Sequence, residues 1–280
     1  MNCQYVLRRN ALLGISYIGA DAFAECENLT QVTFCDTLKT IAPFAFWGCT
    51  NLGNFELPEG LTGIGQEAFE GSEKLTLIVI PDSVTFLDSG ICENDINLTY
   101  AYIGGDINAG VYTYSNCPFR NCVALEAIEV SEDNIALCSI DGVLYSKRGT
   151  NWVSDFYVVP EDSVQLVQYP AGKKEKTYKL VDKTFKIEQF GMEWAQYLEE
   201  VIIPDTVLEI GEYAISVCPK LQKIVIPSSV KKLGDGIGSN CNQLKTKMHL
   251  TTNGLSGESI DKWCQYWKNV ETKFDSGRNQ

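Results

Sequence analysis

One stretch sets the pattern of the chain: Cys49-Thr-Asn-Leu52-Gly-Asn-Phe-Glu-Leu57-Pro58-Glu-Gly-Leu61-Thr-Gly-Ile64-Gly-Gln-Glu-Ala68-Phe69-Glu-Gly71. Its residue types return at a spacing of 23, so that each position forms a column of equivalent residues. The leucine column contains Leu29, Leu52, Leu75 and Leu98, and then Leu198, Leu221 and Leu244. Further columns contain cysteine, proline, isoleucine and phenylalanine. Self-similarity at a fixed interval of this length indicates stacked structural units.

Each 23-residue unit, called a coil below, has the features of a short strand followed by a return segment. Leu75-Thr-Leu-Ile-Val-Ile80 has strand-like composition, and Pro81 ends it because proline has no N–H to donate. One coil cannot bury its own apolar residues, whereas stacked coils bury them continuously. We therefore predict a leucine-rich repeat solenoid: a right-handed, curved stack of coils with short parallel strands and irregular or short helical return segments.

The spacing also predicts the limits of this solenoid. We expect one solenoid over residues 1–258, with an irregular inserted island at about 134–172, where the leucine spacing is disturbed. Within the island, Asp141-Gly142 predicts a hairpin turn. Residues 259–280 are predicted to form a helical cap and tail, because their apolar residues have helical spacing and Ser259 can serve as the N-cap. A partner-binding helix is the alternative for this segment.

Composition excludes several functions. The chain has 280 residues, a net charge of −13 and a single histidine, His249. An acidic chain without a basic stripe is a poor ligand for nucleic acids and anionic membranes. One histidine cannot supply a zinc site that needs two or more. The sequence contains no phosphate loop, dinucleotide fingerprint or nucleophile elbow, and no apolar run near the ~18 residues of a membrane span. We predict no cofactor, no metal site, no catalytic residue, no nucleic-acid partner and no transmembrane segment in this chain.

The eleven cysteines need a separate explanation. No pair has the C-x-x-C spacing of zinc ribbons or redox motifs. Six belong to one column, three residues before the leucine: Cys3, Cys26, Cys49, Cys122, Cys218 and Cys241. Free cysteine behaves as a small, often buried residue. Neighbouring members of the column could bridge pairwise, but we predict that most are reduced, buried thiols.

Together these columns resemble the BspA-like (Treponema-type) leucine-rich repeats, whose unit is similar to C-x-x-L-x-x-I-x-I-P-x-x-V-x-x-I-G-x-x-A-F-x-G. The resemblance covers roughly residues 3–250, with local departures such as Cys92 at a phenylalanine position and the lack of a proline in the unit around Tyr100-Ala-Tyr-Ile-Gly-Gly105. It implies an exported, often surface-attached protein linked to adhesion or host contact. The N-terminal residues do not look like a signal peptide, so the chain is expected to be intracellular or a trimmed piece of a longer protein; the resemblance favours an extracellular or cell-surface location.

Strand alternation predicts where a ligand would bind. The second and fourth residues after each column leucine should lie on the concave surface. Two adjacent rungs of this surface are apolar or aromatic, and two glutamates flank them; we call these six residues the tyrosine patch: Leu77, Val79, Tyr100, Tyr102, Glu56 and Glu129. Tyrosine is enriched at interfaces, although β-branched and aromatic residues also simply favour strands.

We therefore expect a non-enzymatic module that binds a protein or glycan ligand through this patch. Two alternatives stay open at the level of sequence. The chain could be a structural spacer in a larger surface protein. It could also be an enzyme that uses acidic residues. Four acidic residues, Glu126, Glu129, Glu132 and Asp133, resemble a cation site, but a solvated face explains them better, since calcium loops need tighter oxygen spacing.

Overall fold

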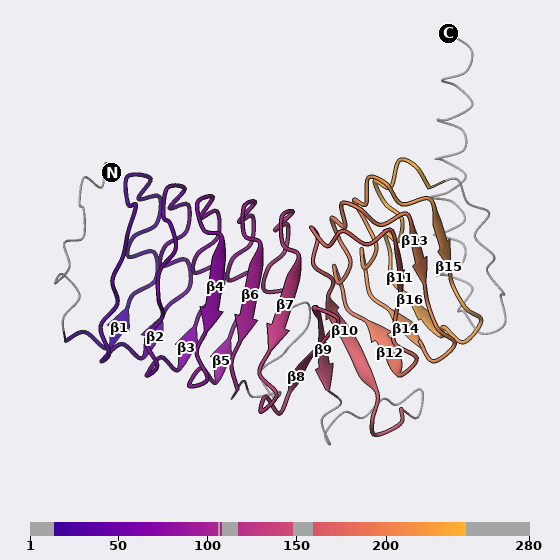
Figure 1. Ribbon diagram of the computed structural model, residues 1–280, viewed down its shortest axis with the longest axis horizontal. Coiled ribbons are helices and arrows are strands. Elements are labelled where there is room, and N and C mark those ends of the chain that lie inside the picture. Colours follow the sequence, from indigo (N-terminus) through magenta and orange to yellow (C-terminus); the bar gives the residue numbers. More distant parts are fainter. Residues whose placement is uncertain (1–13, 106, 108–116, 148–158, 245–280) are drawn as a thin grey trace, which may run out of the picture.

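The computed structural model describes residues 14–105, 107, 117–147 and 159–244 of the chain. The predicted C-terminal helical segment, His249 and Cys3 lie outside these residues. The described part is a β-solenoid of about nine coils stacked about 23 residues apart, which confirms the predicted fold class. In Figure 1 the coils follow one another in chain order from the indigo N-terminal end to the orange C-terminal end.

Two parallel sheets run through the N-terminal half. A four-stranded sheet has the order β1 (Tyr17–Ile18), β2 (Thr40–Ile41), β3 (Gly63–Ile64) and β5 (Phe86–Leu87). A three-stranded sheet has the order β4 (Leu77–Ile80), β6 (Tyr100–Ile103) and β7 (Ala127–Val130). Ile18 pairs with Ile41, and Ile41 pairs with Ile64, so the 23-residue spacing is the register of the first sheet. The isoleucine column is therefore a hydrogen-bonded ladder.

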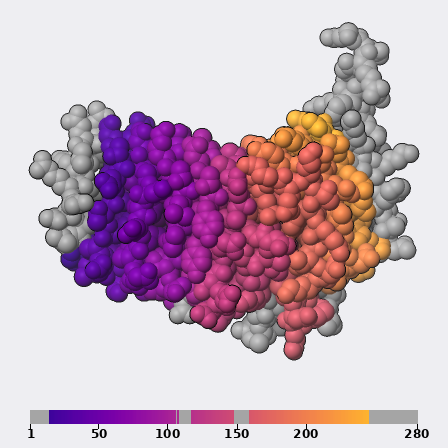
Figure 2. Space-filling model, viewed as in Figure 1, coloured from indigo at the N-terminus to yellow at the C-terminus, as the bar shows by residue number. Residues whose placement is uncertain are grey.

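The C-terminal half repeats this arrangement. One three-stranded parallel sheet contains β11 (Thr177–Lys179), β13 (Glu200–Ile202) and β15 (Lys223–Val225). A six-stranded sheet has the order β16 (Lys232–Leu233), β14 (Glu209–Ile210), β12 (Thr184–Ile187), β10 (Val164–Gln168), β9 (Val143–Lys147) and β8 (Leu137–Ile140). The upper outline of the space-filling view dips where the two halves meet (Figure 2).

The hairpin between β8 and β9 lies at this junction. These two strands are antiparallel, and Ile140 pairs with Val143 across the turn. Asp141 and Gly142 have φ angles of 53° and 74°, as a two-residue turn with left-handed central residues requires. The hairpin predicted from Asp141-Gly142 is therefore confirmed. β9 also pairs antiparallel with β10, and the parallel ladder resumes only between β10 and β12.

The column residues form the core. Every leucine of the column is buried, from Leu29 to Leu244. Phe46 stacks between Phe23 and Phe69, with ring centroids 5.0 and 5.4 Å apart. The buried residues form two clusters that adjoin at the hairpin, where Leu144 belongs to the first cluster and Val143 to the second. The stack is thus one fold with two adjoining cores.

The return segments are turns, and no helix occurs in the described residues. They contain many non-glycine residues with positive φ, such as Phe44 at 59° and Glu67 at 51°. This conformation is costly for such side chains unless the surroundings impose it. Backbone hydrogen bonds between coils do so: the Phe44 N–H donates to the Gln66 carbonyl at 2.9 Å, and the Glu67 N–H donates to the Ser89 carbonyl at 3.0 Å. Of the two predicted forms of the return segments, irregular or short helical, the irregular form is therefore observed.

The cysteine column lies inside these turns. Its described members are all buried, and no disulfide joins any two of the described cysteines. The Cys49 Sγ lies 3.1 Å from the Phe23 carbonyl oxygen, and the Cys122 Sγ lies 2.9 Å from that of Cys92, so each thiol donates to the preceding coil. Burial raises the pKa of Cys122 well above its usual value. The predicted burial of the column is confirmed, and its thiols serve as weak donors between coils.

Candidate binding surface

The structure brings five residues of the tyrosine patch together on one sheet. In the β4–β6–β7 sheet, Leu77 pairs with Tyr100, and Val79 pairs with Tyr102. Leu77, Val79 and Tyr100 are 40%, 47% and 37% exposed, and Tyr102 is half-buried. Tyr102 pairs in turn with Glu129 on β7. The two apolar rungs and the glutamate therefore form one continuous outward surface.

The opposite face of the same strands is buried. Ile78, Ile80, Ala101 and Ile103 alternate with the patch residues and belong to the core. Alternation thus separates the residues that hold the strands in place from those that face outward. The outward side chains contribute little to the core, so packing does not explain why they are apolar. Single exposed apolar residues are normal, but a contiguous group of them indicates an interaction site.

Glu56 lies on the preceding coil, beside this sheet and outside any strand. The ladder ends there because Asn54 occupies the edge of β4. Its Oδ1 accepts hydrogen bonds from the backbone N–H groups of Thr76 (2.8 Å) and Leu77 (3.3 Å), and its Nδ2 donates to the Thr76 hydroxyl (2.9 Å). Glu56 is exposed. The patch therefore has a carboxylate on the coil before it and a second, Glu129, within the sheet.

The charge of Glu129 acts on Tyr100. The pKa of Tyr100 is raised, first by partial burial and then by the charges of Glu129 and Tyr102. The Tyr100 hydroxyl therefore keeps its proton at physiological pH and can donate or accept a hydrogen bond. An arrangement of phenols, aliphatic side chains and flanking carboxylates suits recognition of a molecular surface.

The other acidic residues noted in the sequence do not converge on this patch. Glu126 forms an ion pair with Lys174, with Oε1 and Nζ 2.5 Å apart. Glu132 and Asp133 are exposed beyond the end of β7. Across the described ranges, no group of three or more histidine, cysteine, aspartate or glutamate side chains is arranged to hold a metal ion. Nor does that part of the chain contain a helix long and apolar enough to cross a membrane.

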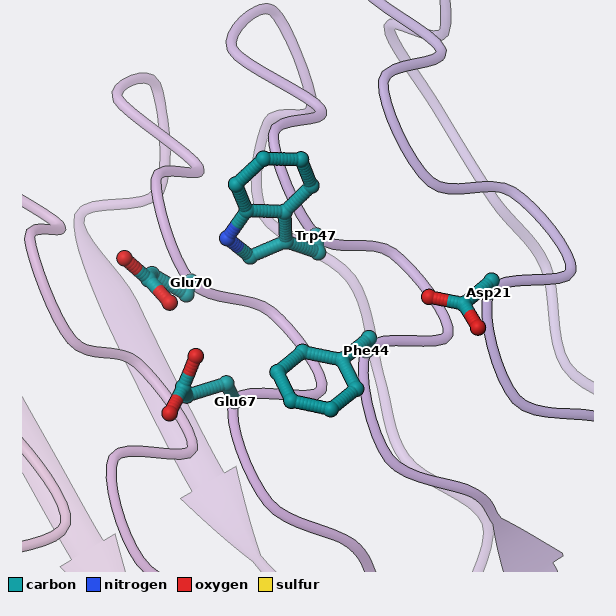
Figure 3. A pocket seen from close by; sticks show the side chains of 5 residues that line it. All are labelled: Asp21, Phe44, Trp47, Glu67 and Glu70. Carbon is teal, nitrogen blue, oxygen red and sulfur yellow. The ribbon is translucent and has the colours of Figure 1, made fainter.

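Sequence reasoning missed a pocket on the return segments. An open pocket of about 410 Å³ is lined by Asp21, Phe44, Trp47, Glu67 and Glu70. In Figure 3 the Trp47 ring lies above the Phe44 ring, with the two glutamates on the left and Asp21 on the right. Its signal in the sequence is the column itself, because Asp21, Phe44 and Glu67 are 23 residues apart, as are Trp47 and Glu70.

Comparison with known proteins identifies the class as bacterial leucine-rich repeat solenoids. The family model for the BspA type leucine rich repeat region matches residues 10–126 and 172–266 in six copies. The chain therefore belongs to the BspA-type leucine-rich repeat family. No curated protein gives a significant match.

Solved structures agree with this assignment. A leucine rich cell surface protein from Faecalibacterium prausnitzii A2-165 is 26% identical, with a TM-score of 0.58 over 82% of this chain and 63% of that one. A leucine-rich repeat protein from Eubacterium ventriosum is also 26% identical, with a TM-score of 0.58 over 83% of this chain and 57% of that one. The pneumococcal vaccine antigen PcpA, 20% identical with a TM-score of 0.54 over 82% of this chain and 66% of that one, shares the fold. The chain thus spans less than two thirds of the length of the first two proteins.

Proposed function

We propose that this chain is a non-enzymatic binding module of a secreted or cell-surface protein, and that it contacts a protein or glycan ligand through the tyrosine patch. The carrying observation is the outward row of Leu77, Val79, Tyr100 and Tyr102 on neighbouring strands. Tyrosine supplies rigid, amphipathic contact area at low entropic cost. Membership of the BspA-type family and the likeness to a F. prausnitzii cell surface protein support the location.

The flanking carboxylates favour one kind of ligand. Glu56 and Glu129 lie at the margins of the apolar rows. A partner with an apolar or glycan contact area would match the centre of the patch, and basic groups around that area would match the two glutamates at its rim. Charges at the rim of an interface set specificity and association rate more than affinity. We place this function in adhesion or in contact with host or matrix components.

A binding panel tests the proposal. The full chain is immobilised and exposed to purified extracellular-matrix proteins and a glycan array, beside the double variant Tyr100→Ala/Tyr102→Ala. We expect at least one ligand to bind the wild type and to bind the variant at least about thirtyfold more weakly, since aromatic hot spots contribute about 2 kcal/mol or more. The melting temperature should hardly change, because both side chains face outward. Equal binding by the two proteins would rule out the patch, and no binding across the panel would favour a spacer role.

A further inference from the structure

The pocket on the return segments has a composition that the tyrosine patch lacks. Two aromatic rings, Phe44 and Trp47, and three carboxylates, Asp21, Glu67 and Glu70, line one open space (Figure 3). Tryptophan has the largest side chain of the twenty amino acids, and 36% of Trp47 is exposed. Its ring can therefore contact a ligand. Aromatic faces and carboxylates both attract cations.

Contacts between coils fix the backbone at three of the five residues that line the pocket. Asp21, Phe44 and Glu67 occupy the same column and all have positive φ, at 55°, 59° and 51°. Each N–H donates to the next coil; that of Asp21, for example, donates to the Pro43 carbonyl at 3.3 Å. A conformation of this cost persists only where the surroundings fix it. The positions from which these three side chains project are therefore set by the stack of coils.

At the junction of the two halves, residues of the same columns already hold a cation, which is Arg120, itself in the column of Trp47 and Glu70. Phe190 occupies the column of Phe44, three residues after the isoleucine, and Glu193 occupies the column of Trp47 and Glu70. The Arg120 guanidinium carbon lies 4.0 Å from the centroid of the Phe190 ring. Its Nε lies 2.7 Å from the Glu193 Oε2. The guanidinium also reaches the Glu93 Oε1, 3.4 Å from one of its terminal nitrogens.

The N-terminal pocket has the ring and the carboxylates without the cation. No described lysine, arginine or histidine forms an ion pair with Asp21, Glu67 or Glu70. The two glutamates are instead held by neutral amides: the Gln66 Nε2 donates to the Glu67 Oε1 at 2.7 Å, and the Asn94 Nδ2 donates to the Glu70 Oε1 at 2.9 Å. Amide hydrogen bonds orient a carboxylate but do not neutralise it.

We infer that this pocket binds the guanidinium group of an external ligand, between the faces of Phe44 and Trp47 and the carboxylates of Glu67 and Glu70. The internal Arg120 site shows that an aromatic ring and carboxylates of these columns contact a guanidinium group together. Planar guanidinium both stacks on aromatic rings and pairs with carboxylates in a fork, which a compact ammonium does not. An arginine side chain of a partner protein and a free guanidino amine share this chemistry. The inference does not depend on the tyrosine patch.

Protonation of the glutamates gives the site a pH dependence. The pKa of Glu70 is raised to about 7, first by burial, then by the hydrogen bond from the protonated carboxyl to Glu67, and further by the charges of Glu67 and Glu93. A bound cation favours the ionised carboxylate. Binding should therefore tighten as pH rises from 6 to 8, by about fivefold as Glu70 loses its proton. Asp21 and Glu67 are the other acids that line the pocket, and the Arg120 ion pair occupies Glu93.

NMR titration of the full chain tests the inference. The Trp47 indole signal, assigned with the variant Trp47→Phe, is followed while N-acetyl-arginine amide, agmatine or N-acetyl-citrulline amide is added. The two guanidinium ligands should shift the signal saturably, and citrulline, which is neutral and nearly isosteric with arginine, should not. Tighter binding of the arginine amide than of agmatine assigns the site to a polypeptide, and the reverse order assigns it to a free amine.

Matched variants separate the site from general charge. Glu70→Gln should weaken the arginine amide by about tenfold, as expected for a lost charge-assisted hydrogen bond. Phe44→Leu should weaken it by about threefold. Glu59→Gln removes the same charge from an exposed position that does not line the pocket and should leave binding unchanged. Citrulline binding as well as arginine, an unshifted Trp47 signal, or equal affinity in Glu70→Gln and the wild type would each overturn the inference.

Discussion

The two three-stranded sheets of the solenoid have the same architecture and different outward surfaces. β4–β6–β7 presents four uncharged residues, Leu77, Val79, Tyr100 and Tyr102, and carries its one outward charge on β7, at Glu129. At the equivalent positions, β11–β13–β15 presents three charged residues, two aliphatic ones and a threonine: Thr177, Lys179, Glu200, Ile202, Lys223 and Val225. Beneath both surfaces, the alternating residues are buried and apolar. The same inward pattern therefore supports two different outward chemistries.

This difference shows which positions the fold leaves free. In the C-terminal sheet, the neighbouring rungs carry an ion pair between Lys223 and Glu200, whose Nζ and Oε1 lie 2.5 Å apart. Such a pair keeps this part of the surface polar, and the exposed apolar area beside it is limited to Ile202 and Val225. The N-terminal sheet has no such pair between β4 and β6, where aromatic side chains lie beside aliphatic ones. Because neither arrangement is required by the core, the N-terminal surface is the better candidate for contact with another molecule.

The largest effect is expected from substitution of the buried column leucine, which both halves of the solenoid contain. Leu98 and Leu198 are equivalent and fully buried, one in each half. Leu98→Ala and Leu198→Ala should each lower the free energy of unfolding by about 2–5 kcal/mol, since each leaves a cavity between coils. Urea denaturation of the two variants measures this. A loss below about 1 kcal/mol in one half alone would mean that the two halves do not share one packing scheme.

A smaller effect is expected at Asp95, which is buried in the N-terminal half where the equivalent residue of the C-terminal half is Ala195. Its Oδ1 accepts a hydrogen bond from the Ser72 N–H at 2.7 Å, whereas its Oδ2 accepts none. Burial raises the pKa of Asp95 well above its usual value. The native state therefore keeps a proton that the unfolded chain releases, and stability decreases as pH rises above about 4, the unfolded value.

The variant Asp95→Asn keeps the acceptor and removes the titration. We expect it to increase the free energy of unfolding by about 1–2 kcal/mol at pH 8 and by less at pH 4. Thermal or urea unfolding at the two pH values is the measurement. A gain that is the same at both, or a loss at pH 8, would show that Asp95 is ionised in the folded protein.

The smallest effect concerns the ion pair of the C-terminal sheet. A double-mutant cycle with Lys223→Ala and Glu200→Ala should give a coupling energy of about 0.2–1 kcal/mol, because exposed pairs pay entropy and are screened by salt. The coupling should shrink in 1 M NaCl. A coupling well above this range would mean that surface charge stabilises the C-terminal half in a way that the N-terminal half lacks.

Much of this structure could be predicted from spacing alone. Strand alternation after the column leucine correctly separated the outward Tyr100 and Tyr102 from the buried Ala101 and Ile103, because the pleat has a period of two. The hairpin turn at Asp141-Gly142 could also be predicted, since few other residue pairs adopt the left-handed conformations that its two central positions require. These features depend on local chemistry and on a repeat that imposes one register.

The rest depends on contacts between coils. Residues 54–56 do not form a strand. The Asn54 side chain accepts the hydrogen bond of the Thr76 N–H, which would otherwise be available to a backbone carbonyl of a neighbouring strand. No local signal marks Phe44 for positive φ, which follows from its hydrogen bond to the next coil. The contact between Arg120 and Phe190 joins residues on opposite sides of the hairpin, where the 23-residue spacing fails.

We propose that the N-terminal sheet binds its ligand through the chemistry of its outward side chains and not merely through its shape. Tyr100 and Tyr102 are equivalent to Glu200 and Ile202, so the variant Tyr100→Glu/Tyr102→Ile gives the N-terminal strand the outward residues of its counterpart. The most direct test is the affinity of this variant for a ligand from the binding panel, with Ile202→Ala/Val225→Ala as the control. We predict a loss of at least about tenfold for the exchange variant, with an unchanged melting temperature and full binding by the control. Unchanged affinity in the exchange variant would contradict the claim.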